Sequence, residues 1–289
     1  MPVETLTLFE ETTYQLKRPL LKWAGGKTQL LPVLHKAKPK AFLRYAELFF
    51  GGGAFFWSLA HPGSLLADSN PDLVNFYKVV RDQPSDLLAL TAQLPITRDD
   101  YYRIRAQRTD DLSPVENAAR FAYLNKTCFN GLYRVNRHGD FNTPFGGKPD
   151  TIILDAPNTY AASLLLRRSE IICADFTESF ALLKEGDFVY LDPPYLPIGA
   201  FSDFRRYTKV FFDEAHHIRL AAEFSKLKAR GVMALLSNSA SEKIRCLYKG
   251  YHCVTVMASR HINCNGNGRS KIPELLVANY PLELGDAFS

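Results

Sequence analysis

The sequence predicts an α/β protein in which helices cover both faces of a sheet. Short apolar runs of strand length alternate along the chain with amphipathic segments of helical period. This alternation is typical of sheets whose ligands bind beyond the carboxyl ends of the strands. The chain has 289 residues, of which 46% are hydrophobic and 22% charged, so it is long enough for one large or two smaller globular units.

Seven apolar segments are expected to be strands, and the last two should form a C-terminal antiparallel hairpin. The segment 213–228 has apolar residues at helical spacing and should cover one face of the sheet. The expected strands span residues 43–48, 65–67, 171–174, 188–191, 232–237, 252–257 and 274–280.

Residues 71–165 interrupt the alternation and predict an inserted domain. This region carries helical patterns and then the turn-rich run NGLYRVNRHGDFNTPFGGKPD, without a convincing central strand. We therefore expect one domain made of residues 1–70 and 166–289, and a second of residues 71–165. The helices expected in the insert span residues 71–80, 84–93, 99–108 and 114–126.

Composition excludes several classes of protein. No apolar run reaches 18 residues, which predicts no membrane-spanning helix, and the N-terminus does not have the pattern of a secretory signal. Five cysteines without a C-x-x-C pair argue against a disulfide framework and a cysteine-rich zinc site. We expect a cytoplasmic protein without a metal ion.

Two segments are strongly basic although the net charge is only +5. Residues 17–44 contain eight Lys or Arg and no acid, and residues 120–149 contain five Lys or Arg and one Asp. Basic clusters of this kind indicate a polyanion such as nucleic acid, or a solvated surface balanced by acids elsewhere in the fold.

The segment ELFFGGGAFFWSL (47–59) predicts a strand, a glycine turn and a helix start. Glycines allow a ligand to approach the backbone, and the helix offers unpaired N–H groups. Asp68 ends the next strand, where a carboxylate can bind ribose hydroxyls. The two features together favour the binding of a nucleoside-bearing cofactor. The alternative is a glycine turn that serves packing alone. The G-x-G-x-x-G dinucleotide pattern is not matched.

The N-terminal stretch KWAGGKT (22–28) ends like a phosphate-binding P-loop but lacks its first glycine, since Leu21 stands at that position. We therefore do not expect a nucleoside triphosphatase. An aromatic beside two glycines and two lysines can instead form a wall of a cofactor pocket.

The segment FVYLDPPYLP (188–197) predicts a buried strand that ends at Asp192, because proline cannot donate to a β-ladder. Asp192 can cap a turn or bind a metal, although no His or acid flanks it at ligand spacing. It can also accept hydrogen bonds from an aromatic amine, together with a backbone carbonyl, while Tyr195 stacks on the ring. Two acceptors would localise the lone pair of the amine and disperse positive charge as it attacks.

The combination of DPPY, F-x-G-G-G and K-W-A-G-G-K in this order resembles DNA adenine-N6 methyltransferases of the Dam and DpnII type over nearly the whole chain. The resemblance implies a Rossmann-like methyltransferase sheet with a mostly helical DNA-recognition domain inserted at 71–165. It implies methyl transfer from S-adenosylmethionine, which leaves S-adenosylhomocysteine, to a flipped-out adenine in double-stranded DNA. Asp192, Pro193 and Tyr195 would form the adenine site, without a metal. The residues that would bind the cofactor are Trp23, Lys27, Glu47, Phe49, Gly51, Gly52, Gly53, Asp68 and Asp175.

The run CFNGLYRVNRHGDFNTPFG (128–146) is similar to the recognition hairpin of enzymes that methylate GATC. By this resemblance Phe129, Asn130 and Leu132 lie near the opened base pairs. Phe129 stands where some relatives have Tyr. Arg134 would contact guanine or a phosphate, and Lys22 matches a position that contacts a guanine.

Two later segments also resemble the family. Residues 201–212 would order over the target, and the loop before the last strand, within 263–277, would contact the DNA backbone or only turn a hairpin. We expect a monomer, with a cognate restriction endonuclease as a potential partner. The alternatives are a methyltransferase for another DNA site or an RNA amine, and an inactive DNA-binding module.

Overall fold

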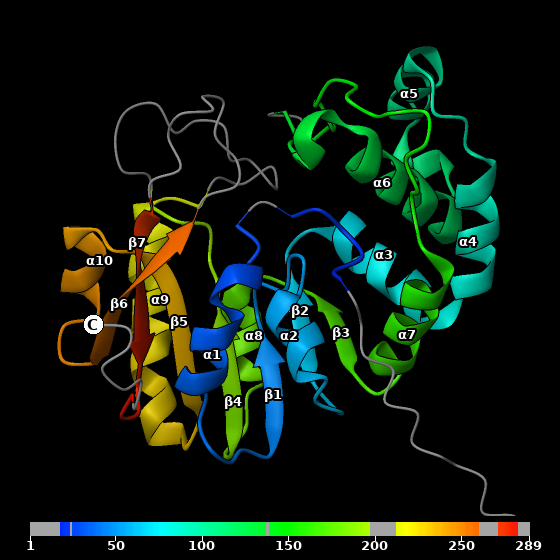
Figure 1. Ribbon diagram of the computed structural model, residues 1–289. Helices are drawn as coiled ribbons and strands as arrows, with labels where there is room; N and C mark the ends of the chain where they lie inside the picture. Colours follow the sequence, from blue (N-terminus) through cyan, green and yellow to red (C-terminus); the bar gives the residue numbers. More distant parts are fainter. Residues whose placement is uncertain (1–17, 24, 137–138, 197–211, 260–270, 283–289) are drawn as a thin grey trace, which may run out of the picture.

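The structure is a computed structural model that describes residues 18–282 apart from 24, 137–138, 197–211 and 260–270. Its centre is one seven-stranded sheet of order β3-β2-β1-β4-β5-β7-β6 (Figure 1). Only β7 runs antiparallel to its neighbours β5 and β6. The strands are β1 (Arg44–Glu47), β2 (Leu65–Asp68), β3 (Glu170–Cys173), β4 (Asp187–Leu191), β5 (Met233–Ser239), β6 (His252–Ser259) and β7 (Lys271–Ala278).

Each expected strand is present, and the prediction of an α/β sheet covered by helices is confirmed. The hairpin strands differ most from their expected bounds, because β7 begins three residues earlier than its apolar run and pairs with β6 through eight residue pairs. The segments 201–211 and 263–270, for which we expect contacts over the target or with DNA, lie outside the described residues.

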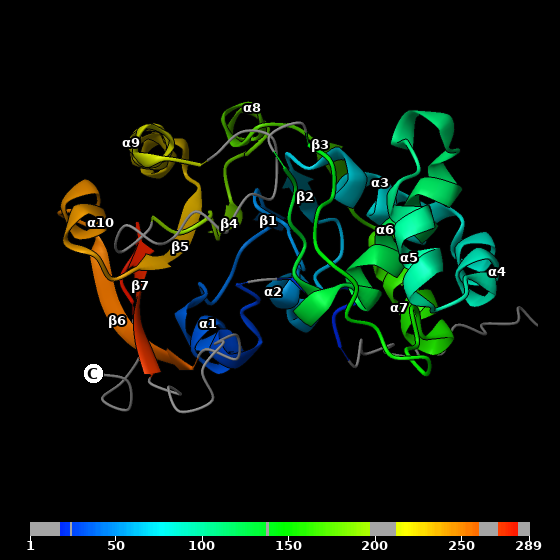
Figure 2. The same cartoon turned by 90° about the horizontal axis from the view of Figure 1, so that it is seen from above.

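Helices cover both faces of the sheet (Figure 2). Helices α1 (Leu31–Ala37) and α2 (Ala54–Leu59) lie on one face, and α8 (Phe176–Ala181) and α9 (Glu214–Leu227) lie on the other. Helix α10 (Glu242–Leu247) adds Ile244 to the same buried cluster as Phe180 and Phe224 of the α8 and α9 face. Short 3₁₀ helices precede α1 and follow α9, as η1 (Thr28–Leu30) and η4 (Lys228–Arg230).

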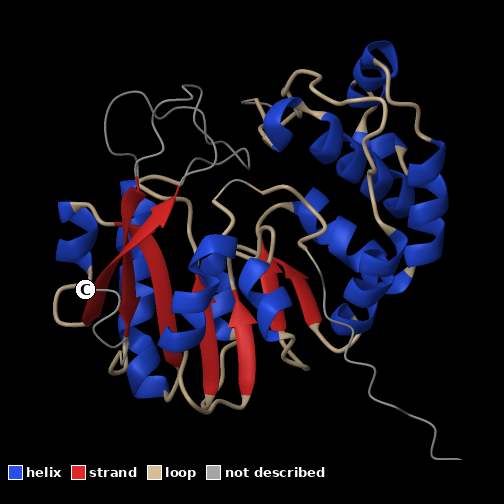
Figure 3. Cartoon of the chain, in the orientation of Figure 1, coloured by secondary structure: helices blue, strands red, loops and turns tan. Residues whose placement is uncertain are grey.

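The chain between β2 and β3 forms helices that lie beyond the β3 edge of the sheet (Figures 1 and 3). In its described part this segment contains no named strand, but two isolated bridges, Cys128 with Phe145 and Val135 with Phe141. Its hydrophobic core is continuous with that of the α1 and α2 face of the sheet. The elements are α3 (Pro71–Asp82), α4 (Pro84–Gln93), α5 (Arg98–Arg105), η2 (Thr109–Asp111), α6 (Pro114–Thr127), η3 (Phe129–Gly131) and α7 (Ala156–Leu166).

Local signals in the sequence explain where these helices begin. The Asn70 side chain accepts hydrogen bonds from the backbone N–H groups of Asp72 and Leu73, and Pro71 occupies the first helical position of α3. Ser113 and Glu116 form a reciprocal capping box at the start of α6. Such caps satisfy backbone donors that have no partner inside the helix.

The strand order places a ligand site between β1 and β4. In the sheet, β1 lies between β2 and β4. The chain continues from β1 to β2 and β3 on one side and then crosses to β4 on the other side. Open α/β sheets bind ligands at such a point, beyond the carboxyl ends of the strands. The glycine turn follows β1 and the DPPY motif follows β4, so both predicted motifs lie at this position.

Candidate active site

Asp192 directly follows β4, and residues from two other segments of the chain contact its carboxylate. The Lys27 ammonium lies 2.9 Å from Asp192 Oδ1, and the Ser237 hydroxyl donates to the same oxygen at 2.8 Å. Asp192 is 22% exposed and Lys27 only 6%. The carboxylate is therefore held in one orientation, with its surface partly open.

The support behind Asp192 comes from two neighbouring strands. The hydroxyl groups of Tyr190 on β4 and Ser237 on β5 are 2.9 Å apart, and both residues are buried. Because alternate residues of a strand share a face, Tyr190 and Asp192 point to the same side of the sheet. A chain of hydroxyls thus runs from the core to the carboxylate.

Lys27 lies inside this site. Its Nζ donates to the Gly25 carbonyl at 2.7 Å and lies 4.7 Å from the centroid of the Tyr195 ring. The sequence predicts Lys27 as a cofactor ligand, and the structure brings it to Asp192 and Tyr195. It thus contacts two of the three residues expected to bind the adenine.

The glycine turn after β1 is held by hydrogen bonds and by the packing of Trp23. The Gly51 N–H donates to Asp68 Oδ2 at 2.9 Å, and the Gly51 carbonyl accepts from the Tyr77 hydroxyl at 3.0 Å. Gly51 has φ +49°, and a Cβ there would lie 2.8 Å from Trp23 Nε1. Trp23 therefore packs directly on the turn, which requires glycine at this position.

Gly52, Gly53 and Asp68 belong to the same unit. The Trp57 indole donates to the Gly52 carbonyl at 2.9 Å, and Gly53, at φ +63°, precedes α2. The second oxygen of Asp68 accepts from the Asn70 N–H at 2.9 Å. Asp68 thus holds the turn and the start of α3 in addition to its predicted contact with the cofactor.

Glu47 is buried at the end of β1, with 3% of its surface exposed. Its Oε1 accepts from the Tyr45 hydroxyl at 2.5 Å and from the Phe56 N–H at 2.8 Å. Burial raises the pKa of Glu47 to about 8. The side chain therefore anchors the start of α2 to β1, and its contact with the cofactor stays a prediction.

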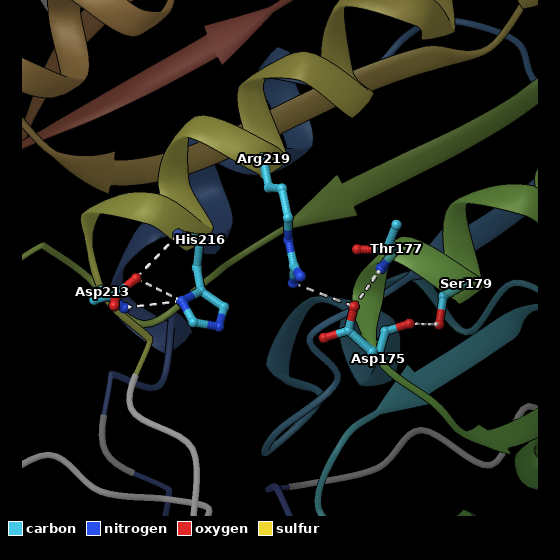
Figure 4. A network of polar contacts seen from close by, with 6 residues as sticks. All are labelled: Asp175, Thr177, Ser179, Asp213, His216 and Arg219. Atoms are coloured by element: carbon cyan, nitrogen blue, oxygen red, sulfur yellow. Dashed lines mark hydrogen bonds and ion pairs between the residues drawn. The ribbon is translucent and has the colours of Figure 1, made fainter.

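Phe49 and Asp175 lie near the carboxyl ends of β1 and β3. The Phe49 ring stacks on Phe176 with centroids 5.6 Å apart. Asp175 caps α8 through a 3.0 Å hydrogen bond from the Thr177 N–H, and the Arg219 guanidinium on α9 lies 3.5 Å from the same oxygen (Figure 4). Asp175 is 46% exposed, so its carboxylate is accessible to a ligand.

The predicted DNA-reading residues Lys22, Phe129 and Asn130 lie in one region. Two hydrogen bonds join the Lys22 backbone to the Asn125 side chain, at 2.9 and 2.7 Å. The Lys22 side chain packs on Gly131, where a Cβ would lie 2.3 Å from its Cδ. Phe129 is 53% exposed, and Asn130 adopts φ +55° in η3.

Leu132 and Arg134 follow on the same loop, in which Val135 bridges to Phe141. The Leu132 carbonyl accepts from the Thr143 hydroxyl at 2.6 Å. Arg134 Nε donates to Asn142 Oδ1 at 2.8 Å, and the Asn142 N–H donates to the Arg134 carbonyl at 3.0 Å. Arg134 is half-buried, and this pairing orients its guanidinium.

The chain is similar to known proteins over most of its length. The family model for D12 class N6 adenine-specific DNA methyltransferases matches residues 23–262. The chain belongs to this family. It is 38% identical over 289 residues to the type II methyltransferase M.MjaIII of Methanocaldococcus jannaschii, covering 91% of this chain and 99% of the relative.

Two further relatives are of similar length. The type II methyltransferase M1.LlaDCHI of Lactococcus lactis is 36% identical over 91% of this chain and 95% of the relative. The DNA adenine methylase of Escherichia coli K12 is 31% identical over 91% of this chain and 96% of the relative. The prediction of an adenine-N6-specific DNA methyltransferase is confirmed. The family implies S-adenosylmethionine as the methyl donor and DNA as the substrate.

The described residues contain neither a cluster of metal ligands nor a membrane-spanning helix. Among them, no group of three or more His, Cys, Asp or Glu side chains is arranged to hold a metal ion. Within the same residues, no helix is long and apolar enough to cross a membrane.

Sequence reasoning missed the site residues Ser237 and Tyr190. Ser237 is the last residue of the strand expected at 232–237, and a serine at the end of a strand has no local pattern that marks it as a site residue. The alternation along β4 indicates that Tyr190 shares a face with Asp192, but the partner on β5 depends on which strands are neighbours.

Proposed function

We propose that this methyltransferase binds its target adenine with Asp192, Pro193 and Tyr195, and that it acts on GATC in duplex DNA. One observation carries the adenine site: the Asp192 carboxylate lies at the β1–β4 switch point, with Oδ1 held by both Lys27 and Ser237. The resemblance of residues 128–146 to GATC-specific hairpins supports the target sequence.

The target amine is a poor nucleophile because its lone pair is delocalised into the adenine ring. Since Lys27 and Ser237 both contact Oδ1, we infer that Asp192 Oδ2 accepts one amine hydrogen and that the Pro193 carbonyl accepts the other. These acceptors localise the lone pair and stabilise the positive charge that develops on N6. Pro193 and Pro194 restrict the backbone and so keep the carbonyl directed at the amine.

The residues at the carboxyl ends of β1, β2 and β3 fit S-adenosylmethionine. Gly51 and Gly53 have positive φ and leave the turn without side chains, while Asp68 and Asp175 supply carboxylates and Phe49 an aromatic face. Trp23 packs on the turn and would close one side of the pocket. When bound, this cofactor supplies an electrophilic methyl group on a sulfonium.

The loop of residues 128–146 and Lys22 form the proposed DNA-reading surface. Phe129 and Asn130 are exposed at η3, where they can contact the base pairs opened by flipping of the adenine. Arg134 can present its fork to a guanine, a contact worth about 1–3 kcal/mol of discrimination. Residues 71–165 would then act as the recognition domain.

The experiment is expression of the full chain in a host without adenine methylation, followed by sequencing of modified bases. We expect N6-methyladenine in GATC. Methylation of another motif would refute the target sequence, and absence of methyladenine with folded protein would refute the function.

The Asp192→Asn variant tests the adenine site, because it keeps the shape of the side chain and removes its charge. We expect single-turnover transfer to fall by about 10²–10³-fold with cofactor affinity unchanged. Transfer at the wild-type rate would refute the site. Two relatives are type II methyltransferases by name, which supports a cognate restriction endonuclease as a partner.

A further inference from the structure

The side chain of Tyr195 contacts strand β7, and this contact has no role in the proposed function. The Tyr195 hydroxyl donates to Glu274 Oε2 at 2.6 Å, across 79 positions of the chain. Glu274 lies on β7, the strand that runs antiparallel to its neighbours. The pair therefore connects the end of the DPPY motif to the C-terminal hairpin.

The register of β7 brings Glu274 to the active-site edge of the sheet. Glu274 is opposite Ser239 of β5 and Val256 of β6. Because alternate residues share a face, Glu274 is on the same side as Leu276, which packs in one buried cluster with Tyr190. Glu274 thus lies level with the last residue of β5, on the face that carries Asp192.

Tyr195 is held at two places. Lys27 Nζ lies 4.7 Å from the centroid of its ring, and Glu274 binds its hydroxyl. Burial and the neighbouring carboxylates of Asp192 and Glu274 raise the pKa of Tyr195 well above its ordinary value, so the phenol stays a donor. A hydrogen bond from a hydroxyl to a carboxylate is short and roughly twice as strong as a neutral one.

We propose that Glu274 is a positioning residue that fixes the Tyr195 ring in the orientation that stacks on the flipped adenine. This inference rests on the proposed role of Tyr195 in the adenine site. A ring that is already oriented loses less rotamer freedom when the base arrives, so the site binds the flipped base more tightly. In this role Glu274 acts through Tyr195 and needs no contact of its own with substrate or cofactor.

The test uses a double-mutant cycle in the full chain. Tyr195→Phe removes the hydroxyl and keeps the ring, and Glu274→Ala removes the acceptor. We expect each to lower the single-turnover rate of methyl transfer by about tenfold, with the double variant no slower than either one. Glu274→Gln retains an acceptor oxygen and should stay within about threefold of wild type.

A second readout distinguishes positioning from stability. The fluorescence of 2-aminopurine placed at the target adenine reports stacking of the flipped base, and both single variants should change it equally while cofactor affinity stays constant. Tyr280→Phe is the control, since it removes a hydroxyl bonded to the Ala37 carbonyl at 2.9 Å, at the other end of β7. It should leave transfer and fluorescence unchanged.

Three outcomes would overturn the inference: wild-type transfer by Tyr195→Phe, additive effects in the double variant, or an unchanged 2-aminopurine signal. If Glu274→Ala does not fold, Tyr195→Phe still tests the inference, because transfer at the wild-type rate by that variant overturns it. Tyr195→Ala distinguishes the role of the Tyr195 ring from the role of Glu274. Normal methyl transfer by this variant would refute the role of Tyr195 in the adenine site. If Tyr195→Ala is slow while Tyr195→Phe and Glu274→Ala are not, the ring is needed but Glu274 does not position it.

Discussion

Replacing Ser237 with alanine would remove one of the two groups that hold Asp192 Oδ1. The Ser237 hydroxyl donates to this oxygen at 2.8 Å and lies 2.9 Å from the Tyr190 hydroxyl. The substitution leaves Lys27 as the remaining contact described for that oxygen, at 2.9 Å. The carboxylate would then turn more freely, and Tyr190 would lose a buried partner.

The expected size of the effect follows from the charge of the acceptor. A hydrogen bond to a charged group contributes about 1.5–3 kcal/mol. If that free energy is lost in the transition state, the rate of methyl transfer falls by about 10- to 150-fold. Affinity for S-adenosylmethionine should stay constant, because Ser237 lies behind the adenine site.

The assay is single-turnover transfer of a labelled methyl group to a duplex with one GATC site, together with cofactor titration. Ser163→Ala is the matched control, since this buried hydroxyl on α7 donates to the Arg81 carbonyl at 2.9 Å, in the helical region between β2 and β3. A Ser237→Ala enzyme as fast as wild type would refute the orientation of Asp192 by this contact. An equal loss in Ser163→Ala would show that the effect is one of stability.

Three further predictions concern the turn, the buried acid and the DNA contact. Gly51→Ala should displace Trp23 and weaken cofactor binding by at least about tenfold. The reason is that Gly51 has φ +49° and that the new Cβ would lie 2.8 Å from the Trp23 indole. An unchanged dissociation constant for the cofactor, together with unchanged tryptophan emission, would contradict this. The folded pKa of Glu47 is raised from 4.5 to about 8, so its stabilising contribution is full below pH 4.5 and is lost as pH rises through 8. Glu47→Gln should therefore remove a slope of about 1.4 kcal/mol per pH unit from the free energy of unfolding, measured with urea between pH 5 and 8; equal slopes in both proteins would count against it. Arg134→Ala should relax the preference for GATC if Arg134 reads guanine, measured on duplexes with single base changes; a uniform loss of affinity for all DNA would indicate a phosphate contact instead.

The local motifs of the active site could be predicted because each depends on a short stretch of chain. Proline excludes a β-ladder, so the strand had to end at Asp192, and three glycines in a row after an apolar run indicate a turn that a ligand can approach. The α/β alternation predicted the sheet for the same reason, since apolar periodicity is a property of neighbouring residues.

The groups that orient these motifs depend on strand order and register, which local patterns do not contain. Ser237 meets Asp192 because β5 lies beside β4, and Glu274 meets Tyr195 because β7 is inserted antiparallel between β5 and β6. A shift of one residue in β7 would turn Glu274 to the opposite face.

The combination of DPPY, the glycine turn and KWAGGK is enough to predict the reaction, and the apolar periodicity is enough to predict the class of fold. The contacts of Lys27 with Asp192 and Tyr195, and the burial of Glu47 against Tyr45 and Phe56, are visible only in the folded chain. This is because the partner and the pKa of a carboxylate are set by the groups that pack around it. Those neighbours come from segments that only folding brings together.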